Sequence, residues 1–270
     1  MAIIAMNSAA TGLKALSTQL DVISNNIANA NNDGFKASRV NFEDLMYQHR
    51  QEPGTKDAQD DVRPTGIEIG YGTRVAGTQL DMTQGSSTQT GRPLDVLIQG
   101  DGFFQVKTLP GQGDGLAYTR TGKFFEDADG NLVLGSSTGY KLEPPIVIPQ
   151  TATAVTIGTD GQVSVTIPGQ TAPQQLGQIQ LARFVNPQGL VQIGGNFYQR
   201  SDASGPPTLT NPGSEQSGVG TLQQGFVETS NGDPVHELVD LIKTQRTFEL
   251  NSQTIQAADQ MLQQVNNLRQ

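Results

Sequence analysis

The first thirty residues carry apolar side chains at alternating intervals of three and four positions. This spacing is the a/d pattern of a helix that packs against another helix along a narrow seam. The opposite face is polar, and the helix should end within residues 29–34, where Asn and Gly favour caps and turns. The predicted seam consists of Met6, Ala9, Leu13, Leu16, Leu20, Ile23 and Ile27.

The C-terminal residues 234–268 show a second, weaker heptad pattern. Asp233 and Pro234 suit a helix start, because Asp can cap a helix and Pro fits its first position. This seam is less apolar than the first because it includes Thr244 and Asn251, and Asn251 would cost stability but could fix the register of a helix pair. The predicted seam positions are Leu241, Thr244, Phe248, Asn251, Ile255, Ala258, Leu262 and Val265.

Between the two helical patterns, short apolar runs alternate with turn signals such as Asp-Gly and Asn-Pro. The clearest hairpin is predicted over 155–165, around Asp160-Gly161. The fold class is therefore α+β, with paired terminal helices forming a coiled coil and a central antiparallel β domain over 75–221. The predicted strand-like runs are 95–106, 142–148, 155–157, 163–167, 178–185 and 226–229.

Residues 47–66 are charged and almost free of apolar side chains. Such a segment is either a disordered surface loop or an extended arm that becomes ordered against a neighbouring subunit. We place the arm at 47–64, within a connecting region formed by 31–74 and 222–231, and assign 1–30 and 232–270 to the helical core. The arm residues singled out are Tyr47, Arg50, Asp60, Asp61, Arg63 and Pro64.

The net charge is −9, which disfavours binding to nucleic acid or to an anionic membrane. The absence of cysteine excludes thiol catalysis, disulfides and cysteine-ligated zinc. We find neither a cleavable secretory signal nor the roughly 20 apolar residues of a membrane span. The chain is expected to be soluble, with no membrane insertion.

Candidate catalytic and metal-binding patterns are incomplete. The two histidines, His49 and His236, lie in the polar arm and at a helix start, and the chain has no GxSxG motif. His236 begins an incomplete HExxH pattern, and 127–131 resembles a calcium loop but has its Gly at the wrong position. We therefore predict no enzyme activity, no cofactor and no metal site.

Two uses of the helices remain open at this point. They could form a hairpin that packs on the β domain of a monomer. Alternatively, their narrow seams leave apolar surface for other copies, and identical copies related by a non-closing rotation build a helical filament.

Several motifs together resemble the flagellar basal-body rod and hook proteins, nearly end to end and in order. The N-terminal motif contains Asn25, Asn26, Asn29, Gly34, Phe35 and Lys36. The later motifs are 94–104, 118–122 with 129–133, 224–231, 244–251 and 259–262. The chain lacks the large inserted outer domain of many hook proteins, and the extra segment 47–64 is similar to that of the distal-rod members of this family.

The resemblance implies a structural subunit that is exported unfolded and polymerises into a straight, hollow shaft across the periplasm. In that family the shaft transmits motor torque to the hook. The terminal helices pair around the export channel, the β domain forms an outer layer, and the extra arm contacts neighbours. The implied partners are further copies of the chain, proximal rod proteins, the hook protein, the P and L rings, the rod cap and the flagellar type III export apparatus.

Two other interpretations stay open on sequence alone. One is a hook or proximal-rod relative. The other is a secreted, non-enzymatic β protein that binds glycan or peptidoglycan and uses its helices to dimerise. A tubular polymer would favour the rod interpretation, whereas discrete dimers would favour the binder.

Overall fold

The computed structural model describes residues 2–54, 64–108, 115–136, 138–170, 172–214 and 218–267. The chain divides into two compact units. Unit 1 comprises Met1–Ala28, Ser38–Leu80 and Asp233–Gln270, and unit 2 comprises Asn29–Ala37 and Asp81–Gly232. The chain therefore passes from one unit to the other at four positions. As expected, the fold is α+β, with a helix near each end and a mostly antiparallel β region between them.

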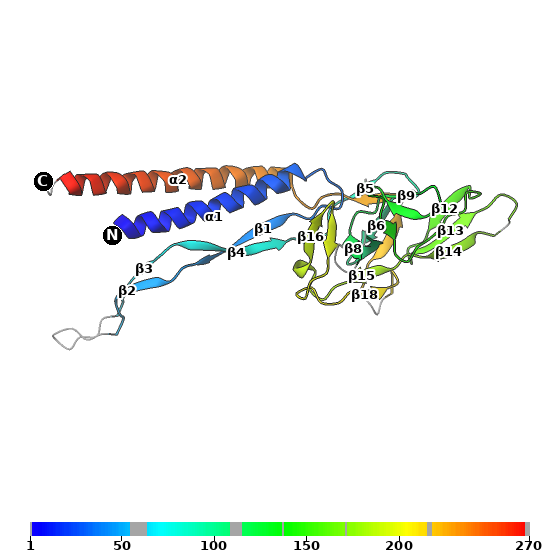
Figure 1. The fold of residues 1–270 in the computed structure, drawn as a ribbon, viewed down its shortest axis with the longest axis horizontal. Helices are drawn as coiled ribbons and strands as arrows, with labels where there is room; N and C mark the ends of the chain where they lie inside the picture. The colour runs from blue at the N-terminus through cyan, green and yellow to red at the C-terminus, as the bar shows by residue number, and fades with distance from the viewer. Residues whose placement is uncertain are drawn as a thin grey trace. The chain divides into compact units, whose positions relative to one another are not determined.

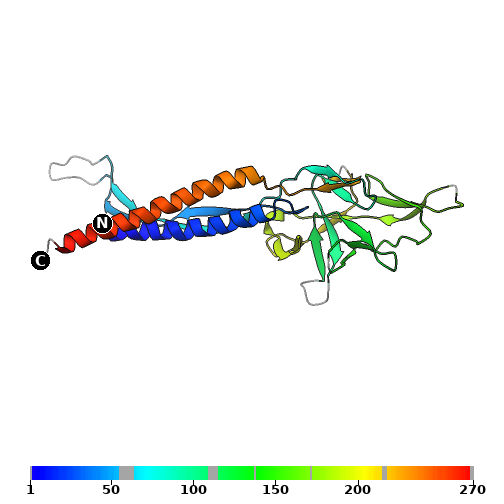
Figure 2. The same cartoon turned by 90° about the horizontal axis from the view of Figure 1, so that it is seen from above.

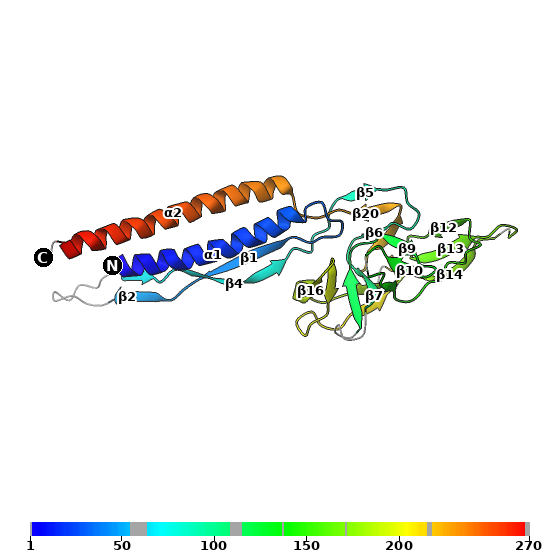
Figure 3. The ribbon, with the colours of Figure 1, turned by 45° about the horizontal axis from the view of Figure 1, so that its top comes forward.

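Unit 1 contains two long helices, α1 (Ala2–Ala28) and α2 (Pro234–Asn267). α1 ends just before the predicted stop at 29–34, and α2 begins at Pro234 as predicted. Asp233 caps α2, since its Oδ1 accepts a hydrogen bond from the Val235 N–H at 2.9 Å. The helices run antiparallel, side by side (Figures 1 and 3).

A long β ribbon covers a second side of α1 (Figure 1). The ribbon pairs β1 (Ser38–Asp44) with β4 (Thr73–Leu80), and β2 (Tyr47–Gln51) with β3 (Ile67–Gly70), all antiparallel. Close approach to α1 requires Gly72, whose φ is +115° and whose added Cβ would collide with the Thr11 hydroxyl. The same hydroxyl accepts a hydrogen bond from the Thr73 N–H at 3.3 Å.

Unit 2 is built from antiparallel strands. Its largest sheet has the order β16-β17-β8-β7-β11-β10-β9, and β15 pairs with both β7 and β18. Smaller sheets are β12-β13-β14, β19-β6 and β20-β5. The bounds are β5 Ser87–Gln89, β6 Val96–Gln99, β7 Phe103–Lys107, β8 Leu116–Thr119, β9 Phe124–Glu126, β10 Leu132–Leu134, β11 Lys141–Leu142, β12 Ala154–Ile157, β13 Gln162–Thr166, β14 Gln174–Gln178, β15 Leu181–Arg183, β16 Val191–Gly194, β17 Phe197–Gln199, β18 Thr208–Thr210, β19 Thr221–Gln224 and β20 Phe226–Glu228, with a 3-10 turn at Pro187–Gly189.

Several predicted strands are confirmed and others need correction. The hairpin over 155–165 is present as β12 and β13 around Asp160-Gly161. The run 95–106 is two strands, because Gly100 and Gly102 adopt φ of +107° and +134° between them. The run 142–148 forms strand only at its start, before Pro144 and Pro145, which cannot donate ladder hydrogen bonds.

The core of unit 2 is apolar and closely packed. Phe104 and Phe124 meet edge to face with ring centroids 5.1 Å apart. A second aromatic group, on the other side of β7, joins Phe103 to Phe184 at 5.8 Å and to Tyr198 at 5.9 Å. Neither long helix, as far as it is described, contains a stretch apolar enough to cross a membrane.

Candidate assembly surface

The predicted seam of α1 is the covered side of the helix. Ala9 and Ile23 are buried, and Met6, Leu13, Leu16, Leu20 and Ile27 are half-buried. Ala15, outside the predicted seam, is also buried. The covered stripe is broader than expected because both α2 and the β1–β4 ribbon pack on α1.

The Asn251 side chain of α2 lies against Gly12 of α1. A Cβ added at Gly12 would be 3.2 Å from the Asn251 Nδ2 atom, so Gly12 makes room for this side chain. The predicted seam of α2 is otherwise only partly covered: Thr244 and Ala258 are buried, Leu241 and Ile255 are half-buried.

The rest of α2 exposes an unusual number of large apolar side chains. Phe248 and Leu262, both predicted seam residues, are each 36% exposed. In all views α2 extends past the start of α1 (Figure 2), which leaves Val265 uncovered at 63% exposure. Further exposed large apolar residues lie off the predicted seam: Val235, Leu238, Val239, Ile242, Leu250 and Met261. We call these six residues the outer apolar face of α2.

The arm is described only at its base. Tyr47 and Arg50 lie in β2, and both are exposed, as is Pro64. The Tyr47 hydroxyl has its pKa raised by a hydrogen bond to the Asp44 carboxylate, and the His49 ring lies 3.0 Å from the Glu68 carboxylate. Asp60, Asp61 and Arg63 lie outside the described residues.

The N-terminal family motif is divided between the units. Asn26 is buried in unit 1, where it contacts Ser38 and Glu237, and Asn25 is exposed. The Asn29 carbonyl accepts the Asn32 N–H at 3.0 Å in a turn of unit 2. Gly34 adopts a φ of +73°, a left-handed conformation that favours glycine, and Phe35 is half-buried.

Lys36, the last motif residue, enters a buried ionic cluster that the sequence did not reveal. Its Nζ donates to the Glu228 carboxylate at 2.5 Å, and the Arg120 Nε lies 3.2 Å from the other oxygen of Glu228. Lys36, Glu228 and Arg120 are 0%, 2% and 4% exposed. Burial lowers the pKa of the Lys36 amine and of the Arg120 guanidinium, while Glu228 opposes both shifts. Three separate sequence motifs thus converge on one point of unit 2.

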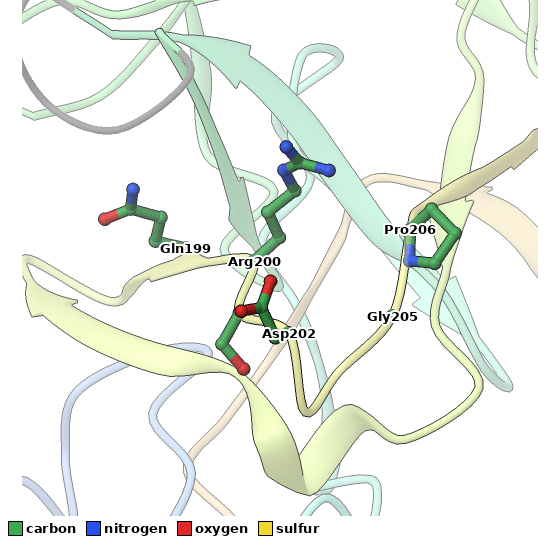
Figure 4. A pocket seen from close by; sticks show the side chains of 6 residues that line it. Gln199, Arg200, Asp202, Gly205 and Pro206 are labelled. Carbon is green, nitrogen blue, oxygen red and sulfur yellow. The ribbon is translucent and has the colours of Figure 1, made fainter.

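Each unit has a hollow on its described surface. One in unit 1 is apolar and lies between α1 and β3, lined by Ile4, Ala5, Ser8, Ile69 and Gly70. The other is a polar hollow of about 290 Å³ in unit 2, with Gln199, Arg200 and Asp202 around it (Figure 4). The Ser201 hydroxyl beside it already donates to the Gly189 carbonyl at 2.5 Å.

Neither histidine is held in a catalytic arrangement. His49 pairs with Glu68 on the exposed arm, and His236 is exposed 3.8 Å from Asp233. Across the described ranges there is no cluster of three or more His, Asp or Glu side chains that could hold a metal ion.

Comparison with known proteins identifies the family. The chain matches "Flagella basal body rod protein" over residues 6–36, "Flagellar hook protein FlgE/F/G D1 domain" over 97–165, and "Flagellar basal body rod FlgEFG protein C-terminal" over 223–268. It is 47% identical to the flagellar basal-body rod protein FlgG of Buchnera aphidicola subsp. Schizaphis graminum, over 96% of each chain. The chain belongs to the flagellar basal-body rod family.

Other members of the basal-body rod family match over nearly their whole length. FlgG of Caulobacter vibrioides is 43% identical over 98% of this chain and 99% of its own. FlgG of Borreliella burgdorferi is 42% identical over 98% of each chain. Among solved structures, the Helicobacter pylori hook protein FlgE2 shows a weak likeness, at 15% identity and a TM-score of 0.24, over 62% of this chain and 47% of that chain.

Proposed function

We propose that this chain is a structural subunit of the bacterial flagellar distal rod, in the basal body that spans the periplasm. The observation that carries the proposal is the near full-length similarity to proteins named as basal-body rod protein FlgG. The role is mechanical rather than catalytic: the subunits polymerise into a rigid, hollow shaft that carries torque to the hook and conducts exported subunits.

The terminal helices pair as a coiled coil and form the inner wall of the shaft. Support comes from the seam: its α1 residues are buried or half-buried, and Asn251 fits beside Gly12. A polar residue at such a position can fix the register of a helix pair. The predicted β domain over 75–221 forms the outer layer, except for 75–80, which belong to β4 of unit 1; the predicted connecting region is 31–74 and 222–231.

The outer apolar face of α2 is the surface on which a neighbouring copy packs. Val235 and Leu250 are 68% and 62% exposed, and a single chain leaves them in water. Exposed apolar patches of this kind mark interaction sites in soluble proteins. Burying one such side chain contributes roughly 1.5–3 kcal/mol, so a repeated contact along a polymer is strongly favourable.

The arm over 47–64 stiffens the shaft by contacting neighbouring subunits. The base of the arm is consistent with this role, because β2 pairs with β3 while all five β2 side chains stay exposed. The partners are other copies of the chain, the proximal rod proteins, the hook protein, the P and L rings, the rod cap and the export apparatus.

Genetic removal tests the function. Cells that lack this chain should build basal bodies whose rods end before the distal segment and carry no hook, and expression of the chain should restore both. Electron microscopy of isolated basal bodies is the measurement. Complete rods and hooks in the deletion strain would refute the proposal.

A further inference from the structure

We propose that the buried Lys36–Glu228 pair holds the two segments that lead to α1 and α2 side by side before those helices pair. We call the pair, with Arg120 and Asn231, the junction clamp. The inference rests on the proposed function, because it assigns the clamp a role in assembly. It concerns residues 29–37 and 226–232, both in unit 2, next to points where the chain leaves that unit.

Backbone contacts show how closely the two segments lie. The Gly34 N–H donates to the Glu228 carbonyl at 2.8 Å. The Ala37 N–H donates to the Asn231 Oδ1 at 2.8 Å. A Cβ added at Gly232 would lie 3.7 Å from the Ala37 Cβ, so the segments remain neighbours up to their ends.

A third segment, the first residues of unit 2 after β4, is fastened by the same side chains. The Lys36 Nζ donates to the Thr83 carbonyl at 2.6 Å, and the Asn231 Nδ2 donates to the Asp81 carbonyl at 2.8 Å. The Gly85 N–H donates to the Glu228 carboxylate at 2.9 Å. Every passage of the chain between the units is therefore bordered by a segment of the clamp.

The buried charges of the clamp make its contacts form together or not at all. A buried ammonium or carboxylate is tolerated only when it is paired and hydrogen-bonded. Arg120 ties the pair to the sheet, because its guanidinium also donates to the Gly100 and Gly102 carbonyls at 2.8 and 2.7 Å. Removing Lys36 would leave Glu228 buried with a weaker partner, and the segments should separate.

The clamp can form without the helices. Lys36, Arg120, Glu228 and Asn231 and the partners given above all belong to unit 2. A clamp that closes first keeps the start of α2 near the end of α1. Helix pairing, which is intramolecular in any case, then takes place at a raised effective concentration of about millimolar, as for two modules joined by a short linker.

The first test compares Lys36→Met with Lys123→Met in the full-length monomer. Lys123 pairs with Asp33 at a partly exposed site, so its loss controls for removing a lysine and an ion pair. In Lys36→Met, hydrogen exchange at the Gly34, Ala37 and Gly85 amides should accelerate about tenfold or more. In the same variant, the exchange rates of amides in the β12–β13 hairpin should change by less than about twofold. In Lys123→Met, the exchange rates of the junction amides should also change by less than about twofold. Unchanged junction amides, or equal acceleration throughout unit 2, would overturn the proposal.

The second test asks whether position alone restores assembly. Lys36→Met should slow polymer elongation about tenfold, through loss of the held helix ends. Because the chain has no cysteine, Ala37→Cys with Gly232→Cys can form one designed disulfide, and the 3.7 Å separation fits a disulfide. Oxidation should restore elongation in the Lys36→Met background, and reduction should abolish it again. Elongation that does not recover would overturn the positioning role.

Asn231→Ala supplies a milder variant if Lys36→Met does not fold, since it removes the contacts to Ala37 and Asp81 without leaving a buried charge. It should give the same local exchange pattern with a smaller acceleration, and normal exchange at Ala37 would contradict the clamp. Failure of the proposed function itself would be seen separately, as a wild-type chain that builds no rod although its junction exchanges slowly.

Discussion

Asn26, near the end of α1, donates its side-chain amide to the Glu237 carboxylate in the first turn of α2 at 2.9 Å. The same amide donates to the Ser38 carbonyl at 2.8 Å, and the Asn26 Oδ1 accepts the Ser38 N–H at 3.0 Å. One buried side chain therefore joins α1, α2 and the start of β1. Burial raises the pKa of Glu237, its bond to Asn26 partly offsets that shift, and the nearby Asp240 adds to it.

Asn26→Ala should weaken unit 1 at this point. The variant leaves both backbone groups of Ser38 without their side-chain partner, and an unsatisfied buried group costs about 1–3 kcal/mol. Chemical denaturation followed by the helical circular dichroism signal measures the loss. Ser24→Ala, at an exposed position of the same helix, is the control and should change stability by less than about 0.5 kcal/mol. Equal stability of the two variants would contradict the joining role of Asn26.

Glu237→Gln should stabilise the helix pair near neutral pH. The raised pKa means that the folded state holds the proton more tightly than the unfolded state, so the wild type loses stability as pH rises above the ordinary value of 4.5. Gln keeps an acceptor for Asn26 and does not titrate. Water screens this partly exposed carboxyl, so we expect a gain of roughly a few tenths of a kcal/mol at pH 7 that vanishes below pH 4.5. A stability gain of Glu237→Gln that grows as the pH falls would contradict the raised pKa of Glu237.

Leu20→Asp should block polymerisation and leave unit 2 folded. Leu20 is a half-buried seam residue, and burying such a side chain is worth about 1.5–3 kcal/mol. Ser17→Asp places the same charge on the exposed face of α1 and should still assemble. Electron microscopy reports the polymers, and near-ultraviolet circular dichroism reports the aromatic core of unit 2. Normal polymers from Leu20→Asp would refute the seam.

The periodicity of the sequence predicts the two helices well, because helix spacing, the Asp233 cap and the Asn- and Gly-rich stop are local signals. The apolar run over 95–106 predicts one strand, and its division at Gly100 and Gly102 does not follow from periodicity, because the pattern does not show that both glycines adopt a positive φ. Lys36, Arg120 and Glu228 could not be paired from one sequence, because no local pattern links residues that far apart. The exposure of Val235 and Leu250 was also hidden: apolar side chains alone do not tell which partner covers them.

Ile242→Gln should separate the stability of the chain from its assembly. Ile242 is 49% exposed on the outer apolar face of α2, so the monomer should change by less than about 0.5 kcal/mol. Polymerisation should fail or need a much higher protein concentration. Gln245→Ala, at another exposed position of α2, is the control and should assemble normally. Sedimentation across a concentration series gives the protein concentration at which each variant begins to polymerise. An unchanged threshold concentration for Ile242→Gln would exclude this face from the contact between copies.

Replacing 47–64 by a Gly/Ser linker of equal length should soften the shaft. The replacement keeps chain length but removes the arm side chains, and such linkers behave as flexible coils. Polymers should then bend toward hook-like curvature, whereas wild-type polymers stay straight. Polymer curvature is measured in electron micrographs. Straight polymers from the replaced chain would contradict the proposal that the arm stiffens the shaft.

A cryo-electron microscopy map of the assembled rod tests the central claim most directly. The account predicts paired α1 and α2 helices around a central channel, with Val235, Leu238, Ile242 and Leu250 of each copy buried against a neighbouring copy. A map in which these four side chains face solvent or the open channel, or in which the terminal helices are unpaired, would contradict it.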